Sequence, residues 1–267
     1  MKTIAIANQK GGTGKTTTCV NLAACLARLG LRVLAIDIDS QANLTSHFGL
    51  TPFDLDLTIY EVLTNPNIVF TKQAQVIKNV RPNLDLIPAN LNLSSLDIEL
   101  AGAVNRDQRL RRKLKDIADS YDYILIDCPP ALNFATLNAF TACNILLVCV
   151  QTHLFSFTAV EKLLQTVNEV SEQYEIPIAA YALPTMFEKS SNSHNVVLEK
   201  IRDHFGPYSF SPIHKNVRCI DASISCQPVI ELDRSCSASV DYQRLAKEIV
   251  NEFEEKSNRR NAHEELG

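Results

Sequence analysis

The sequence predicts an α/β fold, a mostly parallel and twisted sheet flanked by helices on both faces. Two observations lead to this prediction. Apolar runs of strand length recur along the chain, at residues 3–8, 32–39, 84–89, 121–130, 144–150 and 176–184. The runs are continuous rather than alternating, which is typical of strands buried on both faces of a parallel sheet. Amphipathic stretches lie between them, and strands that alternate with helices build such a sheet.

Length and composition predict one domain. The chain has 267 residues, of which 46% are hydrophobic and 21% are charged, enough to build one large core. No period of about 20 to 50 residues repeats, and no linker is visible. We therefore expect a single domain over residues 1–255 and a mobile C-terminal tail over residues 256–267.

The N-terminus and the cysteines predict a cytoplasmic protein. The first apolar run stops at Asn8 and is much shorter than a secretory signal, and no stretch approaches the roughly 20 apolar residues of a membrane span. The eight cysteines include no C-x-x-C pair. They are better interpreted as small buried thiols than as a disulfide framework or a metal site.

The first strand runs directly into "QKGGTGKTT", a glycine-rich loop that opens a helix. Glycines let the backbone N–H groups turn inward, and the helix N-terminus attracts phosphate. Lys15 is expected to reach the β- and γ-phosphates, the Thr16 hydroxyl to bind magnesium, and Thr17 to contact an inner phosphate. A plain turn does not require Gly-Lys-Thr-Thr at a helix start. The predicted nucleotide-binding residues are Lys10, Gly11, Gly12, Thr13, Gly14, Lys15, Thr16 and Thr17.

The helix that follows the loop is predicted over residues 16–30. Val20, Ala23, Ala24 and Ala27 share one face of it, and Gly30 ends it. This amphipathic pattern predicts a helix packed against the sheet.

Carboxylates follow two later strands. Asp37 and Asp39 end the run at 32–39, and Asp127 ends the apolar part of the run at 121–130. Because ligands bind at the carboxyl ends of parallel strands, we expect all three near the loop. Asp127 is expected to hold magnesium directly or through water. Either Asp37 or Asp39 could support the magnesium shell or orient the attacking water, and each alone could be a strand-end cap.

The loop "KGGTGKTT", followed by "DIDSQAN" and "YDYILIDCPPALN", resembles the ParA/MinD group of deviant-Walker ATPases, and the ParA or Soj branch in particular. The resemblance runs from Lys2 to about Phe253. It implies a P-loop NTPase fold of the ParA/MinD type, ATP and Mg²⁺ as cofactors, a homodimer that forms on ATP, and slow hydrolysis stimulated by a partner.

The resemblance also implies roles for individual residues. Two subunits close face to face over two ATP molecules. Lys10 then reaches the partner's phosphates, Lys15 serves its own nucleotide, and Asp39 positions the hydrolytic water. Lys10, Lys15 and Asp39 are thus the catalytic candidates, and Thr16, Asp37 and Asp127 the magnesium candidates. The family's "DPQGN" reads "DSQAN" here, which leaves the geometry of that loop open.

A formal net charge of −4 argues against a protein that coats nucleic acid unconditionally. The resemblance implies DNA binding without sequence preference in the ATP dimer. Arg218, Lys215 and Lys189 fall in the corresponding stretches. Without the family, such scattered charges are ordinary solvated surface.

A denser basic run covers residues 106–116 and reads as one long helix. Leu110 and Leu114 lie one turn apart and should face the core. The charges then point to solvent, either as a plain solvated face or as an addition to a DNA-facing field.

Two other function classes stay open. A MinD-like membrane-cycling ATPase needs a basic amphipathic C-terminal helix. The apolar stripe here is Leu245, Ile249, Val250 and Phe253, and its neighbours Glu248, Glu252, Glu254 and Glu255 would be repelled by anionic lipid. This helix is therefore expected to pack on the domain. A metabolic or cluster-carrier P-loop enzyme would need paired cysteines, which the spacing does not support.

The sequence therefore predicts an ATPase that dimerises on ATP, binds DNA non-specifically and partitions or positions a cargo. The cargo could be a plasmid or chromosome partition complex, or a protein body such as a carboxysome. A ParB-like protein or a cargo adaptor would stimulate hydrolysis. We expect the protein in the cytoplasm, associated with the nucleoid, without stable membrane association.

Overall fold

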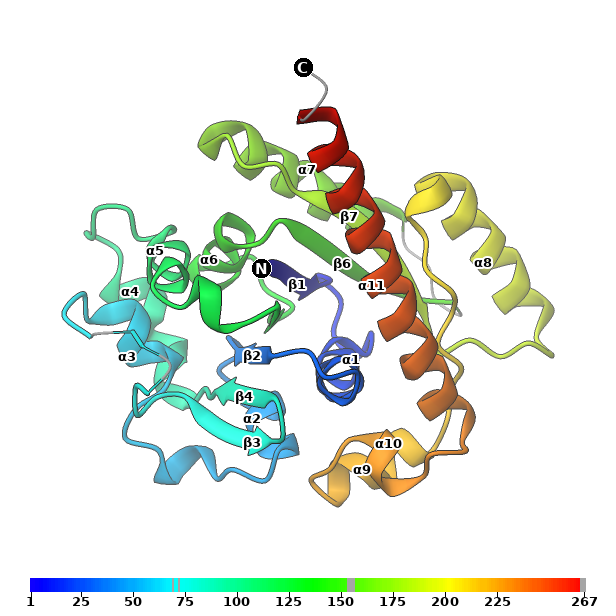
Figure 1. The fold of residues 1–267 in the computed structure, drawn as a ribbon, viewed down its shortest axis with the longest axis horizontal. Coiled ribbons are helices and arrows are strands. Elements are labelled where there is room, and N and C mark those ends of the chain that lie inside the picture. The colour runs from blue at the N-terminus through cyan, green and yellow to red at the C-terminus, as the bar shows by residue number, and fades with distance from the viewer. Residues whose placement is uncertain (69, 72, 153–156, 265–267) are drawn as a thin grey trace.

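The computed structural model describes residues 1–68, 70–71, 73–152 and 157–264 (Figure 1). Seven strands form one sheet in the order β3-β4-β2-β5-β1-β6-β7. The strands are β1 (Lys2–Ala7), β2 (Val33–Asp37), β3 (Lys78–Arg81), β4 (Leu84–Ile87), β5 (Tyr123–Asp127), β6 (Ile145–Gln151) and β7 (Ala179–Thr185). Each of the six predicted runs forms a strand, and all pairs among these six strands are parallel. The predicted fold class is confirmed.

Strand β3 lies at an edge of the sheet and was not predicted from the sequence. It pairs antiparallel with β4, with Lys78 opposite Leu86 and Arg81 opposite Leu84. Its four residues are only partly buried or exposed. A short polar strand at a sheet edge carries no apolar run, so the pattern that predicts central strands cannot detect it.

Helices cover both faces of the sheet (Figure 1). They are α1 (Lys15–Arg28), α2 (Asn43–His47), α3 (Ile59–Thr64), α4 (Leu96–Glu99), α5 (Arg109–Lys115), α6 (Phe134–Ala142), α7 (Phe157–Tyr174), α8 (Asn192–Phe205), α9 (Arg218–Ile224), α10 (Val229–Leu232) and α11 (Ser237–Glu264). Successive residues of β1 point to opposite faces, so Ile4 and Ile6 belong to one core and Ala5 and Ala7 to the other. The first core also contains α1 and α11, and the second contains α3 to α7.

The predicted face of α1 is confirmed. Val20, Ala23, Ala24 and Ala27 are all buried. The helix ends before Gly30, whose φ of +88° lies in the left-handed region that favours glycine. Figure 1 shows α1 beside the long helix α11, and the two pack together.

The apolar stripe of α11 packs on the domain, as predicted. Leu245, Ile249 and Phe253 are buried, and Val250 is partly buried against the same core. The helix continues to Glu264, so the expected tail at 256–267 begins inside it. The mobility of that tail stays a prediction, and residues 265–267 lie outside the described part of the chain.

The prediction of one long helix over residues 106–116 is wrong. Helix α5 begins at Arg109, because the side chain of Asn138 in α6 bonds both the Arg106 carbonyl oxygen, at 2.8 Å, and the Leu110 N–H, at 3.0 Å. Leu110 and Leu114 are buried, as predicted. One basic side chain of this run stabilises the fold, because Arg109 donates to the Leu63 and Thr64 carbonyl oxygens at 2.8 and 3.0 Å.

The cysteines form no disulfide within the described residues, and most are buried. Cys19, Cys25, Cys128, Cys143 and Cys149 lie in the cores. Burial raises the pKa of Cys143 and Cys149 to about 12. The interpretation as small buried thiols holds for these five, whereas Cys219, Cys226 and Cys236 are partly or fully exposed.

None of the helices in the described ranges combines the length and the apolar character that crossing a bilayer requires.

Candidate functional site

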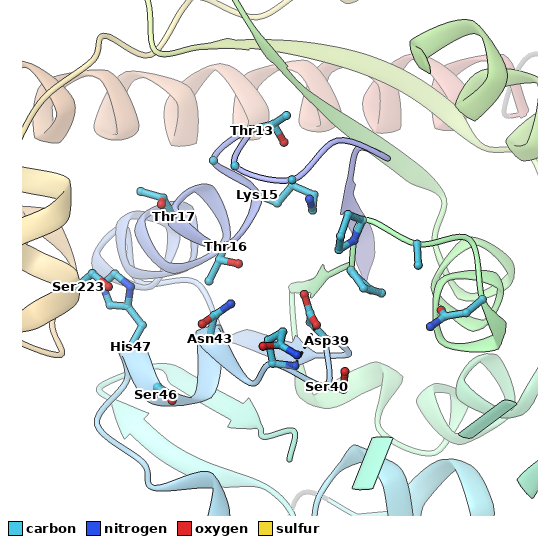
Figure 2. A pocket seen from close by; sticks show the side chains of 18 of the residues that line it. Thr13, Lys15, Thr16, Thr17, Asp39, Ser40, Asn43, Ser46, His47 and Ser223 are labelled. Atoms are coloured by element: carbon cyan, nitrogen blue, oxygen red, sulfur yellow. Dashed lines mark hydrogen bonds between the residues drawn. The ribbon is translucent and has the colours of Figure 1, made fainter. Parts of the chain in front are cut away.

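The glycine-rich loop lies between β1 and α1, as predicted. Gly14 precedes the first residue of α1 with a φ of +86°, and Gly12 has a φ of +71°. Both values lie in the left-handed region, so these two positions favour glycine. A Cβ on Gly14 would make an ordinary van der Waals contact with the Thr185 side chain at 3.8 Å, so the backbone conformation is what favours glycine here. Figure 2 shows Thr13, Lys15, Thr16 and Thr17 of this loop around one cavity.

The ends of two neighbouring strands hold the loop. The Gln151 side-chain amide, at the end of β6, donates to the Gly12 carbonyl oxygen at 2.6 Å. The Thr185 hydroxyl, at the end of β7, donates to the Thr13 carbonyl oxygen at 2.9 Å. These bonds occupy carbonyl groups, which leaves the loop's N–H groups available for phosphate. Gln151 and Thr185 were not predicted as site residues, and each directly follows a predicted strand run.

The two lysines of the loop lie in different surroundings. Lys15 is 8% exposed and lines the cavity, and its Nζ donates to the Lys10 carbonyl oxygen at 3.2 Å. Lys10 is half-buried and does not belong to the set of residues that line the cavity. Its backbone N–H is fixed by the Asn8 side chain at 3.0 Å. The two lysines therefore differ in position, and their separate roles stay a prediction.

Thr16 and Asp127 meet beneath the cavity. The Thr16 hydroxyl donates to Asp127 Oδ2 at 2.7 Å. Asp127 is buried, and its Oδ1 has no hydrogen-bond partner within the described residues. Burial raises the pKa of Asp127 well above its usual value, and the neighbouring Asp37 adds to the effect. A buried carboxylate oxygen without a donor beside a hydroxyl fits magnesium, which binds oxygen ligands and retains several waters.

Asp37 is buried and holds the segment that follows β2. Its Oδ2 accepts the Thr45 backbone N–H at 2.9 Å and the Thr45 hydroxyl at 2.7 Å, and its Oδ1 accepts the Asp39 N–H at 3.1 Å. Burial raises its pKa to about 6, although these three bonds favour the ionised form. The sheet register pairs Asp37 with Asp127. The geometry gives Asp37 an anchoring role, and its predicted role in the magnesium shell stays a prediction.

Thr45→Val is expected to destabilise the fold by about 2–4 kcal/mol. The Thr45 hydroxyl donates to Asp37 and also accepts the buried Ala89 N–H at 2.9 Å. Valine has nearly the same shape but removes both bonds. Urea denaturation measures the loss. Thr166→Val is the matched control, since within the described part of the chain that hydroxyl bonds only the Lys162 carbonyl oxygen of its own helix. Equal effects of the two substitutions would contradict this account.

Asp39 lines the cavity, as a water-orienting residue requires. It is half-buried, and its Oδ1 accepts the Gln41 N–H at 3.0 Å. In Figure 2, Asp39 and Lys15 lie on facing sides of the cavity. No hydrogen bond to the second carboxylate oxygen of Asp39 is formed within the described residues, and its role in orienting water stays a prediction.

The whole cavity measures about 720 Å³, room for a nucleotide. Besides the loop, its walls come from the segment after β2, from α2, from the segment after β5 and from the α9–α10 region. Lining residues that the sequence analysis missed are Ser40, Gln41, Asn43, Ser46, His47, Asn133, Ser223 and Cys226. Ser40, Gln41 and Asn43 lie within "DIDSQAN", and Asn133 ends "YDYILIDCPPALN". The other four lie outside the quoted motifs, on α2 and in the α9–α10 region.

His47 forms part of this wall as a neutral side chain. Its Nε2 donates to the Gln227 carbonyl oxygen at 3.1 Å, and burial lowers the pKa of the ring. Figure 2 shows His47 next to Ser223, so α2 and α9 close the cavity on this side.

The three predicted DNA-binding residues are all exposed, and two of them pair with acids. Lys215 Nζ lies 2.8 Å from Glu188, and Arg218 Nη1 lies 3.2 Å from Asp221. The Lys215 N–H bonds the Phe187 carbonyl oxygen at 3.0 Å, which brings Lys215 close to Lys189. Arg218 begins α9 and belongs to a separate element. Exposed ion pairs are weak, so phosphate can replace these acids.

Comparison with known proteins shows the family of this chain. Residues 1–179 match the family described as AAA domain. The chain is 39% identical to the sporulation initiation inhibitor protein Soj of Bacillus subtilis, over 93% of this chain and 98% of Soj. It is 37% identical to the chromosome partitioning protein ParA of Caulobacter vibrioides, over 94% of each.

Solved structures agree as well. Cobyrinic acid a,c-diamide synthase from Mycobacterium smegmatis, with bound ATP analog and magnesium, superposes with a TM-score of 0.82 at 26% identity, over 95% of this chain and 96% of that one. A putative plasmid partition protein from Borrelia burgdorferi, bound to AMPPNP, gives 0.77 at 25% identity, over 94% and 99%. The resemblance seen in the sequence is thereby confirmed. The chain belongs to the AAA-domain family of P-loop ATPases, as a homologue of Soj and ParA.

Proposed function

We propose that this ATPase binds ATP and magnesium in the cavity, dimerises on ATP, binds DNA non-specifically in that state and so partitions or positions a cargo. The observation that carries the proposal is that the two lysines of the loop lie in different positions relative to the cavity. Lys15 lines the chain's own cavity and Lys10 does not. A second lysine beside a complete phosphate loop supports a charge that is supplied to another subunit.

The proposed hydrolysis uses side chains of the loop and of the strand ends. The Lys15 ammonium and the loop N–H groups bind the phosphates. Thr16 and Asp127 would hold the magnesium ion, directly or through water, and the ion neutralises phosphate charge when bound. Asp39 accepts a hydrogen bond from the attacking water and orients it toward the γ-phosphate. In water such charges would be screened, so their partial burial strengthens the effect.

Dimerisation on ATP would bring Lys10 to the partner's phosphates. The backbone around Gly11 supports this reading, because a Cβ placed there has no atom of the described residues within 4 Å, apart from its chain neighbours. The glycine is therefore not required by its own subunit, and a facing backbone is a sufficient reason for it. The closed state then depends on the γ-phosphate, since its charge attracts both lysines.

Conditional DNA binding follows from the charge of the chain. At a formal net charge of −4, one copy offers only a weak local field through Lys189, Lys215 and Arg218. A dimer doubles that patch, and each added phosphate contact increases both affinity and salt dependence. The buried stripe of α11 argues against a membrane-cycling ATPase, since it is part of the core and unavailable to lipid.

The proposed setting is the cytoplasm, in association with the nucleoid. A ParB-like protein or a cargo adaptor would stimulate hydrolysis, and the cargo would be a partition complex or a protein body. The names of the relatives support this assignment: a chromosome partitioning protein in Caulobacter vibrioides and a putative plasmid partition protein in Borrelia burgdorferi.

The proposal is tested by binding to a random-sequence duplex with no nucleotide, ADP, ATP and a non-hydrolysable ATP analogue, over a salt series. We expect strong binding only with ATP or the analogue, and a steep loss of affinity with salt. Sedimentation with anionic vesicles is the parallel control. Binding that ignores the nucleotide, or that occurs with vesicles alone, would contradict the proposal.

A further inference from the structure

The nucleotide cavity has two ends, and its lining residues indicate which end would hold the base. Lys15 and Asp39 face each other at one end, where the γ-phosphate and the attacking water are proposed to lie. Thr17, the residue expected to contact an inner phosphate, lies farther along the cavity, and beyond it lies His47 beside Ser223 (Figure 2). A nucleoside triphosphate whose phosphates follow this line would place its base at the His47 end.

The ring of His47 is held at this end of the cavity in one orientation. The side chain is 5% exposed, and its Nε2 donates to the Gln227 carbonyl oxygen at 3.1 Å. Cys226 also lines the cavity, and a Cβ at Gly49 would lie 3.8 Å from the Cβ of Cys226. The segments that follow α2 and α9 therefore pack together around the ring. A group that is fixed in advance loses little entropy when it binds a ligand.

The hydrogen bond to Gln227 also determines which ring nitrogen carries the proton. A carbonyl oxygen only accepts, so Nε2 carries the hydrogen. Burial, and to a smaller extent the nearby Arg81, lower the pKa of the ring, so His47 is neutral and Nδ1 keeps a lone pair. No hydrogen bond to Nδ1 is formed within the described part of the chain. His47 therefore offers a ligand an acceptor that cannot act as a donor.

An obligate acceptor can distinguish between purine bases, whereas the hydroxyls near it cannot. Ser46 and Ser223 also line the cavity, and each hydroxyl can turn to donate or to accept. A nitrogen lone pair accepts from the exocyclic amino group of adenine, but it is repelled by the exocyclic oxygen of guanine or hypoxanthine. A site built to hydrogen-bond an N–H group rejects the analogue that lacks this group.

We propose that His47 determines the base specificity of this ATPase, with Nδ1 accepting a hydrogen bond from the exocyclic amino group of adenine. This role rests on the proposed function, because it requires that the phosphate loop binds ATP in this cavity. It deepens that function by naming the residue that distinguishes ATP from triphosphates with an oxygen at the same position of the base. Gln227 is a positioning residue, since it acts through the ring of His47.

The test compares the affinities of the full chain for ATP and for inosine triphosphate, whose base carries an oxygen in place of the amino group. Both affinities are measured with magnesium, by displacement of a fluorescent ATP analogue. We expect the unmodified protein to prefer ATP. His47→Gln is expected to reduce this preference roughly tenfold, about the contribution of one hydrogen bond. The glutamine amide nitrogen can replace Nε2 and bond the Gln227 carbonyl oxygen, whereas no glutamine atom replaces Nδ1.

His47→Asn is the complementary variant. The asparagine carbonyl oxygen can occupy the position of Nδ1, but the side chain is too short to reach the Gln227 carbonyl oxygen. This variant should therefore retain more of the preference for ATP than His47→Gln does. His204→Gln is the matched control, because His204 is an exposed histidine of α8 outside the set of lining residues. It should bind both nucleotides like the unmodified protein.

Thermal melting without nucleotide separates this role from a purely structural one. If the bond to Gln227 were all that His47 contributes, His47→Asn would melt at a lower temperature and lose affinity for both nucleotides. His47→Gln would then melt and bind like the unmodified protein. An unchanged ratio of the two affinities in His47→Gln would overturn the assignment.

The unmodified protein alone distinguishes failure of this role from failure of the proposed function. If it binds ATP and inosine triphosphate equally well, the proposed function stands and only the role of His47 fails. If it binds neither nucleotide in the presence of magnesium, the proposed ATP site fails, and the role of His47 fails with it.

Discussion

Lys10→Ala is expected to lower kcat by roughly a thousandfold or more and to prevent ATP-dependent dimerisation, while the variant still binds ATP. The reason is the separation of the two loop lysines. Lys15 lines the cavity and is proposed to bind the subunit's own phosphates, whereas Lys10 lies outside the set of lining residues. The backbone of Lys10 contributes its N–H and carbonyl to the loop, and alanine keeps both of these bonds.

Light scattering with the ATP analogue measures dimer formation, and a fluorescent ATP analogue measures binding to the monomer. Lys15→Ala is the contrasting variant, because it should weaken nucleotide binding itself. A Lys10→Ala protein that dimerises normally on ATP would show that Lys10 does not act across subunits.

Asp127→Asn is expected to lower kcat by roughly a hundredfold or more and, at the same time, to stabilise the ligand-free protein above neutral pH. Burial raises the pKa of Asp127 in the folded state, so the folded chain binds this proton more tightly than the unfolded chain. Its contribution to stability is greatest below the unfolded pKa and falls as the pH rises toward the folded pKa. Asparagine is neutral at every pH and keeps an oxygen for the Thr16 hydroxyl.

Melting curves of both proteins without nucleotide, from about pH 5 to 9, measure this effect, and magnesium-dependent hydrolysis measures the loss of activity. Asp122→Asn provides a control of opposite sign. Hydrogen bonds from Arg32 lower the pKa of Asp122, so its removal should reduce stability at neutral pH. If Asp127→Asn melts at a lower temperature than the unmodified protein at pH 8, the buried Asp127 carboxylate does not destabilise the ligand-free fold.

Much of the fold was predictable because its central strands are buried on both faces. Continuous apolar runs mark such strands, and each of the six runs forms one. The edge strand β3 was not predicted, because a strand at the edge of a sheet needs no apolar run. The predicted length of α5 was wrong for a different reason. Asn138, from another helix, captures the backbone around Arg106, and no local pattern in the basic run shows this.

The candidate site was also predictable only in part. Residues 10–17 and the strand-end carboxylates could be predicted, because one motif or one strand end contains each of them. Gln151, Thr185, His47 and Ser223 could not, since the sheet order and the paths of α2 and α9 bring them to the site from 30 or more residues away. The buried anchoring of Asp37 by Thr45 was also hidden, because a strand-end aspartate looks the same whether it binds metal or backbone.

The buried thiols can be used to measure local opening of the folded chain. Cys19 lies one turn into α1, directly after the phosphate loop, and Cys149 lies in β6 beside Thr18. An alkylating reagent reaches such groups only when the surrounding core opens, so the rate of their modification follows the opening equilibrium. Nucleotide bound at the loop lowers the population of open molecules by mass action. Nucleotide occupancy of the site can therefore be measured as a decrease in the alkylation rate of Cys19, without a probe attached to the protein beforehand.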